Sequence, residues 1–183
     1  MAYTLPVVRM VATACRHATI GVNAQIGALS GAGLLLTGDP APPTFAIGAI
    51  ADEAESAPIA DGGWPAGADP ALAIVQAADW PAPGERMTIA GTRTLEQAIV
   101  ALRYYRRAAS RAVSWRDWQY TARALVRMFR DLFEPSQVSL RTLAQVNLVS
   151  LDELRLVEPW ADPQGSPMVG ALIATMTVRD LAP

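Results

Sequence analysis

Arginine and tyrosine side chains gather near the middle of the chain and form its most distinctive charged group. The arginines are Arg103, Arg106, Arg107 and Arg111, and they flank the pair Tyr104 and Tyr105. Arginine and aromatic rings together can hold nucleic acid through phosphate contacts and base stacking. A formal net charge of −2 and a pI of about 5.4 are unlike those of a dedicated nucleic-acid-binding domain. We therefore expect at most incidental contact with nucleic acid, and we favour a subunit interface or a surface for an acidic protein.

Cys15 and His17 are the only cysteine and the only histidine of the chain. Two positions apart on a helix, their side chains point to different faces, so we expect a core cysteine and a surface histidine rather than a nucleophile and its base. A zinc site of the Cys/His type needs more ligands than the sequence contains. One cysteine allows no disulfide within the chain, and a reducing interior is the expected environment.

Acidic residues are concentrated in a segment rich in glycine and proline. They are Asp52, Glu53, Glu55, Asp61 and Asp69. Their order lacks the closing bidentate glutamate of a calcium loop, so we predict an exposed loop and no metal site. Trp64 is the only aromatic residue between residues 52 and 70, and we expect it to contact a neighbouring subunit or another partner.

None of the common catalytic or nucleotide-binding motifs occurs in the sequence. It has no G-x-S-x-G pattern, no P-loop and no dinucleotide-binding glycine pattern. Gly31 and Gly33 follow a predicted helix rather than a strand, so they are not expected to cradle a phosphate. The sequence motifs therefore predict no catalytic residue, no cofactor and no metal site.

The charge of the chain is unevenly distributed. Residues 86–130, here called the basic centre, contain ten arginines against two acids and carry a net charge of +8. Residues 1–85 contain two arginines against eight acids, a net charge of −6, and residues 131–183 contain three against seven, a net charge of −4. A basic centre between acidic ends favours self-association through complementary charge. Internal pairing within one domain is the alternative.

The segment from Gln97 to Phe133 organises the predicted fold. Residues 97–105 alternate as a strand, and residues 115–133 have the spacing of an amphipathic helix. The apolar stripe of this helix consists of Trp118, Ala122, Leu125, Phe129 and Leu132. Its other side carries Arg116, Arg123, Arg127 and Arg130. Ser114 is the predicted N-cap, and Glu134–Pro135 should end the helix.

The remaining pattern predicts an α+β fold of one domain, residues 1–183, with a loop-rich acidic segment at about 52–83. Residues 6–29 should be helical, in two pieces or with a kink at Gly21 and Asn23. Further strands are expected at 44–50, 71–78, 86–90, 138–149, 153–160 and 168–179, with 150–152 joining two of them. Helices and strands in separate runs favour an antiparallel sheet packed against the long helix and an N-terminal helix. No apolar run is long enough to cross a bilayer.

This order of elements resembles that of the tail terminators and related head–tail joining (neck) proteins of long-tailed bacteriophages. The likeness is carried by Arg16–Leu29, by Gln97–Phe133 and by the end of the chain, Gly170–Asp180. It is one of pattern and size over most of the chain. The segment 52–83 is longer, and richer in proline and glycine, than the corresponding part of such proteins usually needs to be.

The resemblance implies a non-enzymatic virion protein that assembles in the host cytoplasm and lies at the tail–head junction. Such proteins form a ring, commonly a hexamer, that caps the tail tube and joins it to the head or neck connector. The expected partners are then copies of the same chain, the tail tube protein and the connector proteins, without a membrane. Two other classes stay open: another virion joint, such as a head-completion, neck or tail-tube subunit, and a small bacterial enzyme or ligand-binding domain.

Overall fold

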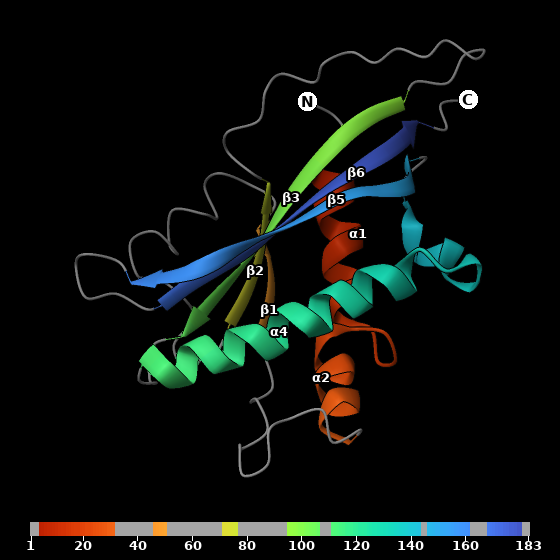
Figure 1. Cartoon of the computed structure of the whole chain (residues 1–183). Helices are drawn as coiled ribbons and strands as arrows, with labels where there is room; N and C mark the ends of the chain where they lie inside the picture. The colour runs from red at the N-terminus through yellow and green to blue at the C-terminus, as the bar shows by residue number, and fades with distance from the viewer. Residues whose placement is uncertain are drawn as a thin grey trace.

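The computed structural model describes residues 4–31, 46–50, 71–76, 95–106, 111–143, 146–161 and 168–180. Two helices come first, followed by three strands, a long helix, a 3-10 segment and three more strands (Figure 1). Their bounds are α1 Thr4–Arg16, α2 Val22–Gly31, β1 Ala46–Ile50, β2 Ala71–Gln76, β3 Leu95–Arg106, α4 Arg111–Leu132, η1 Pro135–Arg141, β4 Thr142–Leu143, β5 Val146–Ala161 and β6 Met168–Asp180.

The strands form one six-stranded sheet in the order β1-β2-β3-β6-β5-β4. All neighbouring strands run antiparallel except β1 and β2, which are parallel. The predicted α+β fold, an antiparallel sheet against a long helix and an N-terminal helix, is confirmed, with one parallel pair at the β1 edge. The strand predicted at 86–90 lies outside the described residues.

Alternation along β3 decides which face of the sheet is buried. Ala98, Val100, Leu102 and Tyr104 are buried, whereas Gln97 and Arg103 are exposed. The buried residues of β3 lie opposite Met176, Ala174, Leu172 and Gly170 of β6, which are buried as well. Directly opposed residues of an antiparallel pair point to the same side, so β3 and β6 share one apolar face.

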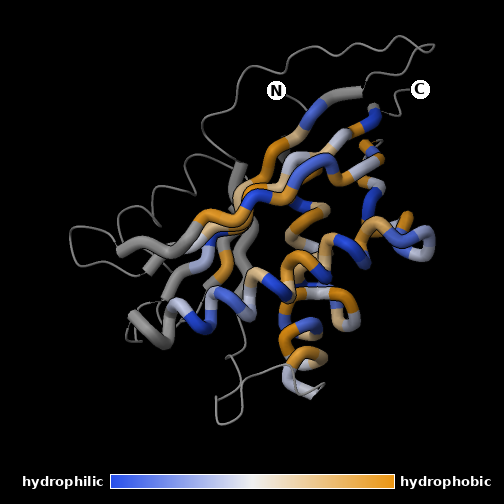
Figure 2. Tube along the Cα trace, viewed as in Figure 1, coloured by the Kyte–Doolittle hydropathy of each residue, from blue (hydrophilic) through white to orange (hydrophobic). Residues whose placement is uncertain are grey.

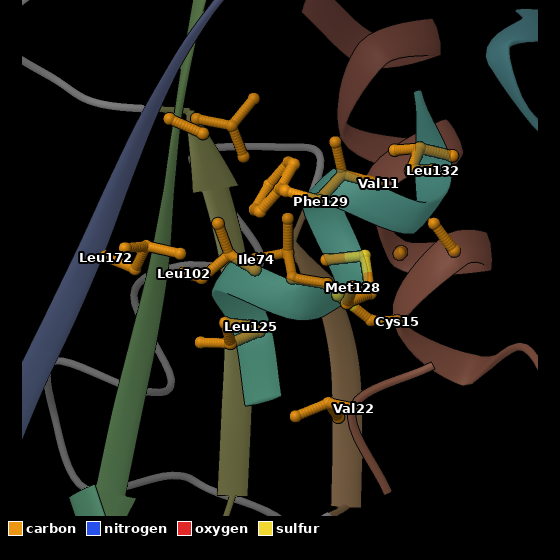
Figure 3. Packing of buried hydrophobic residues seen from close by; sticks show 14 of the residues in the cluster. Val11, Cys15, Val22, Ile74, Leu102, Leu125, Met128, Phe129, Leu132 and Leu172 are labelled. Carbon is orange, nitrogen blue, oxygen red and sulfur yellow. The ribbon is translucent and has the colours of Figure 1, made fainter. Parts of the chain in front are cut away.

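The long helix α4 packs its predicted stripe on that apolar face. Trp118, Ala122, Leu125, Phe129 and Leu132 are all buried in one core cluster with residues of α1, β2, β3 and β6. Figure 3 shows Phe129, Leu125 and Met128 of α4 beside Ile74, Leu102 and Leu172 of the sheet. In Figure 2 hydrophobic and hydrophilic stretches alternate along α4, as expected for a helix with one buried side.

The start of α4 differs from the prediction, whereas its end agrees. The helix begins at Arg111, so Ser114 lies inside it and is not its N-cap. Arginine and alanine favour helix, which extends α4 N-terminal to the expected serine. The helix ends at Leu132, before Glu134–Pro135, as predicted.

The N-terminal segment forms two helices that are separated by residues 17–21. The backbone N–H of Gly21 donates to His17 O at 2.9 Å, and that of Gln25 donates to Gly21 O at 2.9 Å. α1 packs against the sheet and α2 against α4. The side-chain amide of buried Gln25 donates to Asp131 at 2.6 Å and links α2 to the last turn of α4. Of the two forms expected for residues 6–29, the structure has the two-helix form.

The prediction for residues 138–152 is wrong in two places. Residues 138–141 belong to the 3-10 segment η1, Pro135–Arg141, instead of a strand, because Pro135 favours a helical start. Residues 150–152 do not form a connection. They lie within β5, which stays paired with β6 through register shifts at Leu148/Ser150, Leu151/Glu153 and Val157/Trp160. Because a bulge places extra residues on one strand, β5 continues through residues 150–152, which the sequence pattern predicted as a turn.

Candidate interaction groove

A groove with a volume of about 790 Å³ lies beside α4, between α2 and β5. α2 contributes Leu29, β5 contributes Leu156, and α4 contributes the other lining residues. We call it the α4 groove. Its apolar lining consists of Leu29, Trp115, Trp118, Ala122, Val126 and Leu156, and its arginines are Arg123, Arg127 and Arg130.

Exposed apolar side chains distinguish this groove from the rest of the described surface. Trp115 is 36% exposed, Val126 40% and Leu156 53%. In the described part of the chain only two other large apolar residues, Val138 and Leu143, are similarly exposed, so three of five lie in the groove. A contiguous exposed apolar patch on a folded protein commonly marks a binding surface.

Leu156 is exposed although it belongs to the core side of the sheet. It lies opposite Leu172, which is fully buried. Residues opposed on antiparallel strands face the same side, so Leu156 points toward the helical layer. The core face therefore reaches the surface at this part of β5, and the groove forms between that face and α4.

The floor of the groove depends on a close contact between a helix and a glycine. Trp118 is buried, and its ring lies 5.7 Å from that of Tyr104, centroid to centroid. A Cβ atom on Gly170 would lie 2.8 Å from Cδ2 and 2.9 Å from Cε2 of the Trp118 indole. Glycine at residue 170 thus makes room for the indole ring against β6.

Replacing Gly170 by alanine is expected to lower the free energy of unfolding by about 1–3 kcal/mol, because the added methyl group overlaps the Trp118 ring. Trp118→Leu removes the ring atoms involved, so the two substitutions should be coupled in a double-mutant cycle. Urea denaturation of both single variants and the double variant gives the coupling free energy. If the two effects add within about 0.5 kcal/mol, the Trp118 indole does not determine which side chain fits at residue 170.

The arginines of the groove differ in their partners. Arg130 pairs with Asp131 at 2.8 Å. Among the described residues, Arg123 and Arg127 have no ion pair. Arg123 is exposed, and the Nε atom of Arg127 is buried without a hydrogen-bond partner. A buried donor without a partner costs about 1–3 kcal/mol.

The structure tests the sequence-predicted site only in part. Arg103 is exposed on β3, on the face opposite the core. Arg106 ends β3 and Arg111 begins α4, so these two lie at the ends of one connection. Arg107 and Trp64 lie outside the described residues. The structure therefore neither joins these five residues into one site nor separates them.

Sequence reasoning missed the α4 groove, although it identified the arginines on that side of the helix. Trp115 and Val126 lie off the predicted apolar stripe, and a large apolar residue outside the stripe was the available signal. Leu156 gave no signal, because its exposure depends on how far α4 extends along the sheet.

Cys15 is buried, and His17, which is partly exposed, directly follows Arg16, the last residue of α1. Burial raises the pKa of the Cys15 thiol to about 12, and neighbouring Arg16 opposes the shift. Nδ1 of His17 lies 3.1 Å from the hydroxyl oxygen of Thr19 and 3.3 Å from its backbone nitrogen. The core position of the cysteine is as predicted. Over the described ranges no three His, Cys, Asp or Glu side chains are grouped so that they could hold a metal ion.

Comparison with known proteins does not identify the chain. No protein-family model matches it, and no curated protein is significantly similar to it. Among the described helices, none is both long enough and apolar enough to cross a membrane.

Proposed function

We propose that this chain is a non-enzymatic structural protein of a bacteriophage virion, a ring-forming tail terminator that joins the tail tube to the head or neck. The partners are further copies of the chain, the tail tube protein and the connector proteins.

The α4 groove is the observation that carries the proposal. It combines exposed apolar side chains with two arginines that have no ion pair in the described part of the chain. Interfaces between proteins typically have such an apolar centre with arginine and aromatic residues. The groove therefore fits a protein contact better than a catalytic site.

The charge distribution supports a closed ring. A ring is built from head-to-tail contacts, which need two different and complementary patches on every subunit. This chain has a basic centre with a net charge of +8 and acidic flanking segments with net charges of −6 and −4. The order of helices and strands resembles that of tail terminators, which also supports the proposal.

The proposal predicts a discrete oligomer. Light scattering and native mass spectrometry should give one mass that is a small multiple of the 19.5 kDa subunit, and electron microscopy should show rings. Tail tubes of the same phage should be capped at one end by these rings and should stop growing. A chain that stays monomeric at tens of micromolar, with or without tubes, would overturn the proposal.

Reversal of two arginines tests whether the basic centre holds the ring. Exposed ion pairs contribute only about 0–1 kcal/mol each, so Arg106→Glu or Arg107→Glu alone should have little effect. The double variant should give a smaller, more salt-sensitive oligomer with an unchanged circular dichroism spectrum. The matched control is Arg9→Glu with Arg155→Glu, the same change in net charge at exposed positions outside the basic centre. Unchanged oligomer mass of the Arg106/Arg107 variant at low and moderate salt would assign the ring contact to other residues.

A further inference from the structure

We propose that the α4 groove receives the acidic segment 52–69 of a neighbouring copy of this chain. The inference rests on the proposed ring and names the two surfaces that meet in it. The groove belongs to one subunit and the segment to the next, so the contact is repeated around the ring.

The chemistry of the groove defines what can occupy it. Its apolar side chains, led by Trp115 and Leu156, require an apolar group that leaves water. Arg123 and Arg127 can bind negative charge or strong acceptors, since neither has an ion pair within the described ranges. The occupant is therefore acidic and carries at least one large apolar side chain.

Residues 52–69 have both properties. The segment contains five acids, no basic residue and one aromatic residue, Trp64. A tryptophan side chain can bury about 150–250 Å² and is a common anchor of protein interfaces. Five carboxylates provide acceptors for the arginines along α4.

Acids elsewhere in the described structure suit the groove less well. Asp117 is buried. Asp131 accepts a hydrogen bond from Gln25 and forms an ion pair with Arg130. Asp152 accepts hydrogen bonds from Ser150 and Thr177, each at 2.8 Å. Residues 52–69 contain five acids and no basic residue, and they lie outside the basic centre. Contact between different copies is favoured because a ring needs a donor patch and an acceptor patch on each subunit.

The first experiment disables each side of the contact separately. The groove variant is Arg123→Glu with Arg127→Glu, and the segment variant is Glu53→Arg with Glu55→Arg and Trp64→Ala. Each should raise the concentration needed for half-assembly about 10- to 100-fold, since opposite charges are replaced by like charges at a patch that holds several pairs. Arg9→Glu with Arg155→Glu is again the control and should assemble like the wild type. Circular dichroism checks that every variant is folded.

The second experiment shows whether the contact joins different copies. Mixing the groove variant with the segment variant leaves one intact groove and one intact segment, so a 1:1 dimer should form although neither variant assembles alone. A third variant that combines Arg123→Glu and Arg127→Glu with Glu53→Arg and Glu55→Arg, and keeps Trp64, should regain oligomer.

The outcomes separate this inference from the proposed function. If the groove variant still forms the same oligomer as the wild type, the inference is wrong and the proposed ring stands. Loss of assembly without dimer formation on mixing also overturns it, because the segment then binds within its own chain or elsewhere. A wild-type chain that never forms an oligomer overturns the proposed function itself.

Discussion

Replacement of Phe129 by alanine is expected to lower the free energy of unfolding by about 3–5 kcal/mol. The ring is fully buried, and it lies where α4 meets both the sheet and α1 (Figure 3). Truncation removes its apolar contacts and leaves a cavity that the stiff neighbouring strands cannot close. The melting temperature should fall markedly. Urea denaturation followed by circular dichroism measures the change.

Val138→Ala is the matched control for this prediction. Val138 lies in η1, outside the α4 groove, and it is 51% exposed, so its truncation should change stability little. Both variants must be compared at one protein concentration, because assembly stabilises the folded subunit by mass action. Similar losses for the two variants would mean that burial in the α4 stripe is not what stabilises the subunit.

Periodicity explains why much of the fold could be predicted. The alternation in β3 and the helical spacing in α4 each identify a buried side without knowledge of any other element. Because the energy of burial dominates at those positions, Leu102, Leu125 and Phe129 are buried as expected. A break or a kink near Gly21 was expected, because glycine near the middle of a helical pattern is unfavourable, and the structure has the break.

Other features depend on partners that lie far apart in the sequence. The parallel pairing of β1 with β2 depends on the path of the chain between the two strands. The sequence pattern within either strand does not indicate that direction. The bulges of β5 were read as a turn because Ser150 and Asp152 are common in turns. In the structure Asp152 lies at the bulge between Leu151 and Glu153, and its carboxylate accepts a hydrogen bond from the Thr177 hydroxyl of β6. The α4 groove was missed for the same reason, because the exposure of Leu156 reflects how one element covers another.

The outer edge of β5 is a second surface that could form the contact in the proposed ring. Within the described residues, β4 pairs only with Val146 and Asn147, so the rest of that edge has no strand beside it. An open edge is a route to strand addition between chains, but bulges and charged side chains discourage it. β5 has three register shifts, and Asp152, Glu153 and Arg155 are exposed along it. These features favour the α4 groove over the β5 edge as the contact between subunits.

Two glycines of the N-terminal helices should respond in opposite directions to the same substitution. A Cβ atom on Gly21 would overlap the backbone oxygen of His17 and lie 2.5 Å from that of Cys15. These are backbone atoms of the turn between α1 and α2, so they cannot rotate away as a side chain could. Gly21→Ala is therefore expected to cost about 3 kcal/mol, at the upper end for overpacking.

Gly27→Ala is expected to stabilise the protein by about 0.5–1 kcal/mol. Gly27 is exposed in the middle of α2, and an added Cβ would meet no atom within 4 Å. Alanine loses less backbone entropy than glycine when a helix forms. The measurement is urea denaturation of both variants beside the wild type. If Gly21→Ala is as stable as the wild type, the turn between α1 and α2 is not held as closely as the structure places it. A loss in Gly27→Ala would show that the exposed side of α2 is covered in solution by another surface.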